Sequence, residues 1–178
     1  NATELRAEYA HTDGSPMRGQ TGTGAKGKAW LVEAEHHSKD YDLLAYARQQ
    51  DGSFGVGQLN ASESATRKIG VDARARLSKA VSLGALAWQE DQLGRGVRRR
   101  AAAGEFQVRD AQKSATVGLI FAQDELSDGT TNRSTLLKFS GSQKLSKKLI
   151  VDAGAELPID AQDASADFPT RYTLGARY

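Results

Sequence analysis

Apolar and polar residues alternate along the stretch from Ser134 to Ile159. In its second half, aliphatic residues occupy the odd positions from 149 to 159, and Asp152, Gly154 and Glu156 lie between them. In its first half, Leu137 and Phe139 alternate with polar residues in the same way. Successive side chains of a β-strand point to opposite faces, so this pattern predicts two amphipathic strands. The residues Ser-Lys-Lys at 146–148 predict a tight polar turn between them.

The same unit recurs along the whole chain. We expect ten strands, at 3–11, 28–37, 41–49, 67–77, 81–89, 100–109, 115–123, 134–145, 149–159 and 170–178. A helix over 71–86 is the alternative there, since that segment is rich in Ala, Leu, Arg and Lys. Its apolar residues follow a period of two and form no helical stripe, which favours a strand. Trp88 lies opposite the apolar parity of the fifth strand and suggests a bulge.

The connections alternate between long and short. We expect long loops at 12–27, 50–66, 90–99, 124–133 and 160–169, and short turns at 38–40, 78–80, 110–114 and 146–148. Strands of about ten to twelve residues match the length that a tilted strand needs to cross a bilayer. Short turns at one end and long loops at the other are typical of outer-membrane barrels. Both chain ends then lie on the short-turn side.

These patterns predict an all-β fold, an antiparallel up-and-down transmembrane β-barrel of about ten strands. We expect residues 1–178 to form a single barrel domain, closed by itself or part of a larger barrel. The apolar face, rich in Ala, Leu and Val, would contact lipid. The alternative is a soluble barrel or sandwich whose apolar face is an ordinary core. The strand lengths, the one-sided long loops and the many alanines favour the membrane interpretation.

The two predicted faces carry different candidate residues. Aromatic residues near the strand ends on the apolar face predict a girdle at the membrane interfaces: Tyr9, Trp30, Tyr41, Phe121, Tyr172 and Tyr178. Acidic and basic residues on the other face predict a lumen filled with paired charges: Glu4, Arg6, Glu8, Glu33, Glu35, Asp72, Arg74, Arg76, Glu105, Arg109, Lys138, Asp152, Glu156, Arg171 and Arg177. A lumen that binds or passes ions is the alternative.

Composition narrows the functional classes. The chain has 24 basic and 22 acidic residues and a formal net charge of +2, so no basic surface predicts nucleic-acid binding. It has no cysteine, which excludes a disulfide framework and a cysteine metal site. The sequence contains no run of 18 apolar residues, so it predicts no transmembrane helix. No secretory signal precedes the first strand pattern, so we expect a mature form or an excised piece.

The sequence offers weak evidence for catalysis. His11 lies two residues before Asp13 at the loop end of the first strand, and a His oriented by a carboxylate can act as a general base. No nucleophile or second carboxylate completes such a site, so we expect no catalytic residues. The glycines of the first two long loops lack the Gly-Lys-Ser/Thr ending of a phosphate loop. No metal-ligand spacing is present, and we expect neither a metal nor a cofactor.

Taken together, the strands resemble Gram-negative outer-membrane β-barrels. The last segment, RYTLGARY, looks like the C-terminal assembly signal of that class, with Tyr178 where Phe is commonest. More narrowly, KAWLVEAEHHSKDYDLLAYARQQDGSFGVGQ and TRKIGVDARARLS are similar to the barrel region of large bacterial surface proteins that carry extracellular repeat domains. In such proteins the pattern continues past the GARY motif, so extra strands or chains could complete a larger barrel.

This resemblance implies an integral protein of the bacterial outer membrane, with extracellular loops and periplasmic termini. Its expected partners are membrane lipid, including lipopolysaccharide, and the barrel-assembly machinery. In purified protein, detergent would take the place of the lipid. We expect a non-enzymatic membrane anchor or surface module. The two alternatives are a narrow, porin-like channel and a hydrolase at the extracellular rim that uses His11.

Overall fold

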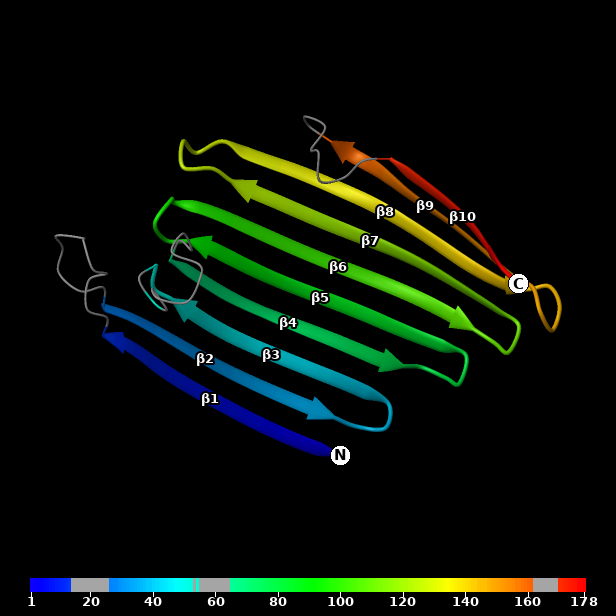
Figure 1. The fold of residues 1–178 in the computed structure, drawn as a ribbon, viewed down its shortest axis with the longest axis horizontal. Helices are drawn as coiled ribbons and strands as arrows, with labels where there is room; N and C mark the ends of the chain where they lie inside the picture. Colours follow the sequence, from blue (N-terminus) through cyan, green and yellow to red (C-terminus); the bar gives the residue numbers. More distant parts are fainter. Residues whose placement is uncertain (14–25, 53, 55–64, 162–169) are drawn as a thin grey trace.

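The computed structural model describes residues 1–13, 26–52, 54, 65–161 and 170–178. They form a single antiparallel sheet of ten strands, arranged side by side in sequence order (Figure 1). The strands are β1 (Ala2–Asp13), β2 (Lys26–His37), β3 (Tyr41–Gln50), β4 (Thr66–Arg76), β5 (Val81–Gln92), β6 (Val97–Arg109), β7 (Lys113–Glu125), β8 (Thr131–Lys144), β9 (Ile150–Ala161) and β10 (Arg171–Arg177). The prediction of an all-β, up-and-down fold is confirmed.

The strand register groups the apolar residues on one face. Leu5 lies opposite Ala34, which lies opposite Ala45 on its other side, and the row continues to Val71 and Ala87. The parity inferred from the sequence is therefore the parity of the sheet. The segment 71–86, for which a helix was the alternative, belongs to β4, a turn and β5. Alternation decided the structure there because helix propensity is a weak preference that packing overrides.

Four tight turns connect the strands at the end where both termini lie (Figure 1). In three of them a serine hydroxyl accepts backbone N–H groups two or three residues ahead: Ser38 accepts from Tyr41, Ser78 from Ala80 and Val81, and Ser146 from Lys148 and Leu149, at 3.0–3.2 Å. These are the three Ser-Lys-x turns of the sequence. Asp110 takes the same role in the fourth turn, where its carboxylate accepts the N–H groups of Gln112 and Lys113.

Two of the predicted long loops are tight turns. The predicted loop 90–99 reduces to residues 93–96, and the loop 124–133 reduces to residues 126–130. The prediction was wrong there because it assigned charged residues to loops. The strands β5 to β8 continue through these residues with unbroken backbone pairing. Gly96 and Gly129 adopt positive φ angles of 65° and 85°, which glycine accepts without strain and which allow these turns to be short.

The sheet is open. Among the described residues, β1 pairs only with β2, and β10 pairs only with β9. The chain therefore does not close a ten-stranded barrel by itself, as one form of the prediction required. The sequence could not decide this, because the alternation along a strand is the same in an open and a closed sheet.

The expected bulge near Trp88 is absent. The pairing of β5 with both its neighbours runs without a shift through Trp88, which lies on the polar face. The shift that the structure shows among its described strands lies between Thr135 and Leu136, where β8 meets β9. Trp88 is accommodated without a bulge because Gly70 and Ala101, its two cross-strand neighbours, are small.

Candidate functional site on the two faces of the sheet

The apolar face of the sheet is exposed. Within the described residues, only Ala122 and Leu136 are buried hydrophobic residues, and both lie on the opposite face. Large residues of the apolar face remain open, among them Leu5 at 74% and Leu174 at 83% of their full exposure. Soluble monomers rarely expose a contiguous apolar patch of more than a few hundred Å². An apolar face this open is therefore unusual for a soluble monomer.

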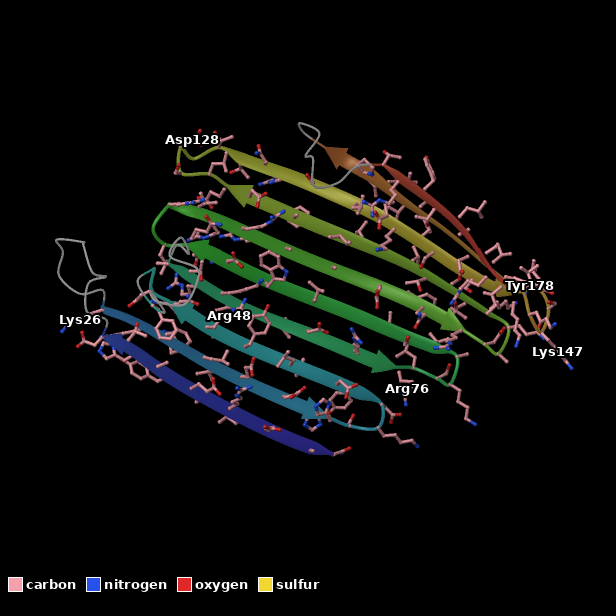
Figure 2. The ribbon with its side chains drawn as sticks, in the orientation of Figure 1. Lys26, Arg48, Arg76, Asp128, Lys147 and Tyr178 are labelled. Carbon is pink, nitrogen blue, oxygen red and sulfur yellow. The ribbon has the colours of Figure 1, made fainter. Side chains whose placement is uncertain are left out.

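The six predicted girdle residues lie on this exposed face or at its border. Tyr9 lies directly opposite Trp30, toward the ends of β1 and β2 that lead away from the short turns. Tyr41 lies at the short-turn end and stacks on His36, with ring centroids 5.2 Å apart. The remaining members are exposed and lie on β7, β10 and the residue after β10: Phe121, Tyr172 and Tyr178. Figure 2 shows Tyr178 and Lys147 at the short-turn end and Lys26 and Asp128 at the other.

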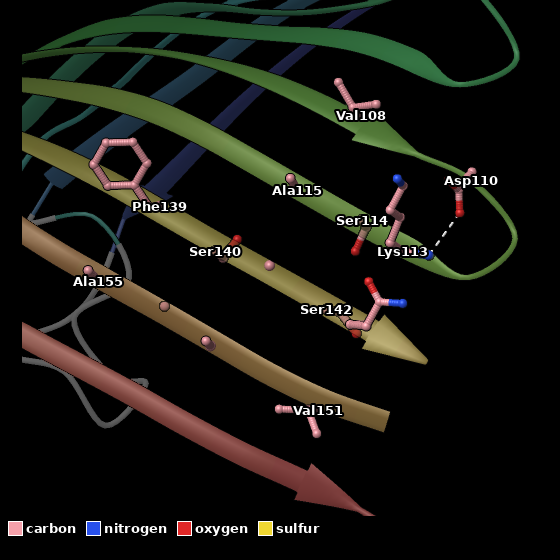
Figure 3. Close-up of a pocket in the computed structure, with 14 residues that line it drawn as sticks. Val108, Asp110, Lys113, Ser114, Ala115, Phe139, Ser140, Ser142, Val151 and Ala155 are labelled. Atoms are coloured by element: carbon pink, nitrogen blue, oxygen red, sulfur yellow. Dashed lines mark hydrogen bonds between the residues drawn. The ribbon is translucent and has the colours of Figure 1, made fainter. Parts of the chain in front are cut away.

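The apolar face is hollowed where its residues are small. One hollow of about 780 Å³ lies over β6 to β9 near the short turns (Figure 3). Its lining includes Ala115, Gly141 and Ala153, and the larger Val108 and Phe139 lie at its sides. Gly141 lies between Ala115 and Ala153 in the register, so this strip presents almost no side chain.

The predicted charges lie together on the polar face, and they pair near its two edges. At the β1 edge, the Arg6 guanidinium hydrogen-bonds to Glu8 at 2.9 Å and lies 3.7 Å from Glu33. At the β10 edge, Glu156 lies 3.0 Å from Lys138 and 3.9 Å from Arg171, so one carboxylate serves two cations. Arg177 and Asp152 form a further pair at 3.1 Å. Glu35 pairs with His37, a partner that the sequence analysis did not include.

Among the predicted charges, this pairing does not extend to the central strands of the polar face. Five of the predicted residues make no ion pair with any described residue: Asp72, Arg74, Arg76, Glu105 and Arg109. The same holds for Glu4, which lies opposite Glu35. Their separation follows from the register, which places glycine or uncharged residues opposite several of them. Glu105, for example, lies between Gly84 and Gly118. The middle of this face therefore carries charges whose groups can interact with water or ions.

Two ion pairs on this face were missed by the sequence analysis. Lys68 lies 3.3 Å from Glu90, and Arg99 lies 3.2 Å from Asp124. Three of the four residues fell in segments predicted as loops, although their parity is that of the polar face once the strands are extended. The Lys68 ammonium also lies 4.0 Å from the centroid of the Trp88 ring, a cation–π contact.

Among the described residues, His11 makes no ion pair with a carboxylate. Its Nδ1 lies 3.1 Å from the carbonyl oxygen of Gly27 and can donate to it. Asp13, the carboxylate considered as its partner, instead lies 3.6 Å from the Lys26 ammonium. Antiparallel pairing explains this outcome, since Asp13 lies opposite Lys26 and His11 lies opposite Lys28. No described group of three or more His, Cys, Asp or Glu side chains is arranged to hold a metal ion.

No protein-family model matches the chain, and no curated protein matches it significantly. Across the described residues, no helix is both long and apolar enough to cross a membrane.

Proposed function

We propose that the chain forms the wall of a β-barrel in the bacterial outer membrane and acts as a membrane anchor or surface module. One observation carries this proposal: in its described residues the ten-stranded sheet leaves a whole apolar face exposed and buries almost no hydrophobic side chain. Lipid is the partner that such a face fits, because the acyl chains remove it from water. The polar face then lines the lumen. The short turns and both termini lie in the periplasm, and the opposite ends of the strands lie outside the cell.

Solubility tests this proposal directly. We expect the full chain to remain with the membrane fraction until detergent is added, and to show a β-dominated far-ultraviolet spectrum in micelles. A monodisperse monomer in buffer without detergent would contradict the proposal. So would a spectrum dominated by helix.

The open edges extend the proposal to partners. The outer edges of β1 and β10 present unpaired backbone N–H and C=O groups, and such edges are not tolerated in lipid. We infer that further strands, from other parts of a longer chain or from other chains, pair with both edges and close a barrel of more than ten strands. The barrel-assembly machinery would insert this complete barrel.

Introduced cysteines test the edges, since the chain has none of its own. In Ala7→Cys/Ala176→Cys, which labels β1 and β10, a short bifunctional thiol reagent should form no link within one chain. The control, Leu5→Cys/Ala34→Cys, labels residues that lie opposite each other in β1 and β2 and should link readily. A link within one chain for the first pair would establish a closed ten-stranded barrel and contradict the larger one. Links between two chains would identify a second copy as the partner.

A pore is the second candidate function, favoured by the unpaired charges on the middle of the polar face. Barrels of about eight strands are filled by their own side chains, whereas wider barrels hold water. In a barrel of more than ten strands, Asp72, Arg74 and Glu105 would face that water. Planar-bilayer recordings should then show conductance, and Arg74→Glu should shift the selectivity toward cations. A complete absence of conductance would leave the anchor function alone.

A further inference from the structure

A row of basic and amide side chains borders the apolar face at the end away from the short turns. On each strand from β1 to β7, a polar residue lies beyond the last apolar residue of that face. None of these seven polar residues is acidic: His11, Lys28, Gln49, Arg67, Gln89, Arg100 and Gln123. On β8, Thr135 and then Arg133 follow Leu137. We call Arg67, Arg98, Arg100 and Arg133 the arginine rim.

A buried carboxylate organises the rim. Asp91 is only 7% exposed, and it accepts hydrogen bonds from Arg98 at 2.6 Å and from Arg67 at 3.1 Å. The Gln89 amide also donates to Asp91 at 3.2 Å, and its oxygen accepts from Arg100 Nε at 3.0 Å. Two guanidinium groups therefore share one buried carboxylate, and Arg100 is held by a neutral group.

The rim carries more positive charge than its own carboxylates neutralise. Asp91 and Glu125 are the carboxylates that lie in ion-pair contact with these arginines among the described residues. In the same part of the chain, neither Arg100 nor Arg133 has a carboxylate within 4 Å, and both are exposed. The guanidinium groups of Arg100 and Arg133 are thus open to an external anion.

An apolar hollow of about 730 Å³ reaches the rim. Alanines of β2, β3, β5 and β6 form much of its lining, and Val32, Ile69 and Phe121 contribute larger side chains. Gln89 and Arg100 belong to the same lining. The Arg100 guanidinium, hydrogen-bonded to Gln89, therefore lies beside an apolar surface. This combination fits a molecule that has an anionic group attached to an acyl chain.

We propose that the arginine rim and this hollow bind an anionic lipid of the outer leaflet, with a phosphate at Arg100 and Arg133 and an acyl chain over the alanines. This inference rests on the proposed function, because it requires the apolar face to lie in a membrane. Guanidinium groups bind phosphate oxygens through paired N–H donors, and basic sites at the membrane border bind anionic head groups. A soluble anion would use the arginines alone and would leave the hollow uncovered.

Native mass spectrometry of the full chain in detergent micelles tests the site. The probes are diphosphoryl lipid A and, as the lipid without net charge, phosphatidylcholine. We expect the chain to prefer lipid A, and Arg100→Gln/Arg133→Gln to weaken that binding by about five-fold for each cation removed. The matched control, Lys79→Gln/Lys147→Gln, removes the same charge from the short turns and should bind lipid A as the unchanged chain does. Ala87→Phe should also weaken binding, because it fills the hollow without changing charge.

The outcomes separate this inference from the proposed function. A chain that is folded in micelles and binds both lipids equally would overturn the lipid site and leave the membrane anchor intact. Equal loss of binding in the rim and control variants would show a general charge effect and would also overturn the site. Loss in the rim variant with no effect of Ala87→Phe would assign the arginines to anions in general. A chain that folds as a monomer without detergent would reject the proposed function and this inference together.

Discussion

At the scale of single residues, Gly70 shows how one position adapts the polar face to large side chains. A Cβ atom at this position would lie 2.5 Å from the hydroxyl oxygen of Tyr46 and 2.9 Å from the Cβ of Trp88. Tyr46 and Trp88 are its two cross-strand neighbours. The tyrosine ring therefore occupies the space that a side chain at position 70 would need. Alternation predicted the face of these residues, but their contact required the register.

We therefore expect Gly70→Ala to destabilise the folded protein by about 1–3 kcal/mol, because the Tyr46 ring must leave its position while the backbone-proximal Cβ of Trp88 cannot. Gly104→Ala is the matched control, since a Cβ there meets no atom within 4 Å. It should be neutral or stabilise by up to about 1 kcal/mol through the unfolded chain. Urea unfolding in micelles measures both. Equal destabilisation by the two variants would contradict the contact.

At the scale of the elements, each short turn depends on a single oxygen that accepts backbone N–H groups. Serine supplies that oxygen in three turns, and Asp110 supplies it between β6 and β7. The N–H groups of Gln112 and Lys113 stabilise the carboxylate form and lower the pKa of Asp110. A short polar side chain directly after a strand can form such hydrogen bonds with the backbone of the next few residues. Because these bonds are local in the sequence, the sequence predicted these turns well.

The pKa of Asp110 gives the β6–β7 hairpin a pH dependence. Because the folded-state pKa is depressed, the stabilisation is present above the pKa of the unfolded side chain and is lost as the pH falls through the depressed value. We expect Asp110→Ser, which keeps an accepting oxygen, to reduce the loss of stability on acidification. Ser78→Ala is the control at the corresponding neutral turn and should lower stability equally at both pH values. Thermal unfolding at neutral and acidic pH would contradict the assignment if Asp110→Ser left the pH dependence unchanged.

At the scale of the whole molecule, substitutions on the two faces can test which face contacts lipid. Val117 lies on the apolar face between Phe106 and Phe139, and Thr116 lies on the polar face between Gln107 and Ser140. Val117→Arg should destabilise the protein by about 2–4 kcal/mol in phosphatidylcholine vesicles, the cost of a charge near the bilayer midplane. Thr116→Arg introduces the same charge on the adjacent residue and should cost much less. Folding titrations in urea measure the difference, and a larger cost for Thr116→Arg would reverse the two faces.

The sequence by itself determined the number of strands, their faces and the positions of the short turns. Each of these features depends on neighbours along the chain: a period of two places alternate side chains on one face, and a Ser-Lys-x segment closes a turn with its own backbone. It failed at 90–99 and 124–133 because charge alone does not distinguish a loop from the end of a strand, and there the strands continue as far as Gln92 and Glu125.

Only the tertiary structure decided which side chains meet and whether the sheet closes. The contact of Asp91 with Arg67 and Arg98 joins three strands, and it exists because the register of both hairpins places these residues in one row. Closure depends on the twist accumulated over ten strands and on partners for β1 and β10, and neither quantity is encoded in the alternation of any single strand. The same pattern of residues is compatible with an open and a closed sheet, so only the pairing of the strands distinguishes them.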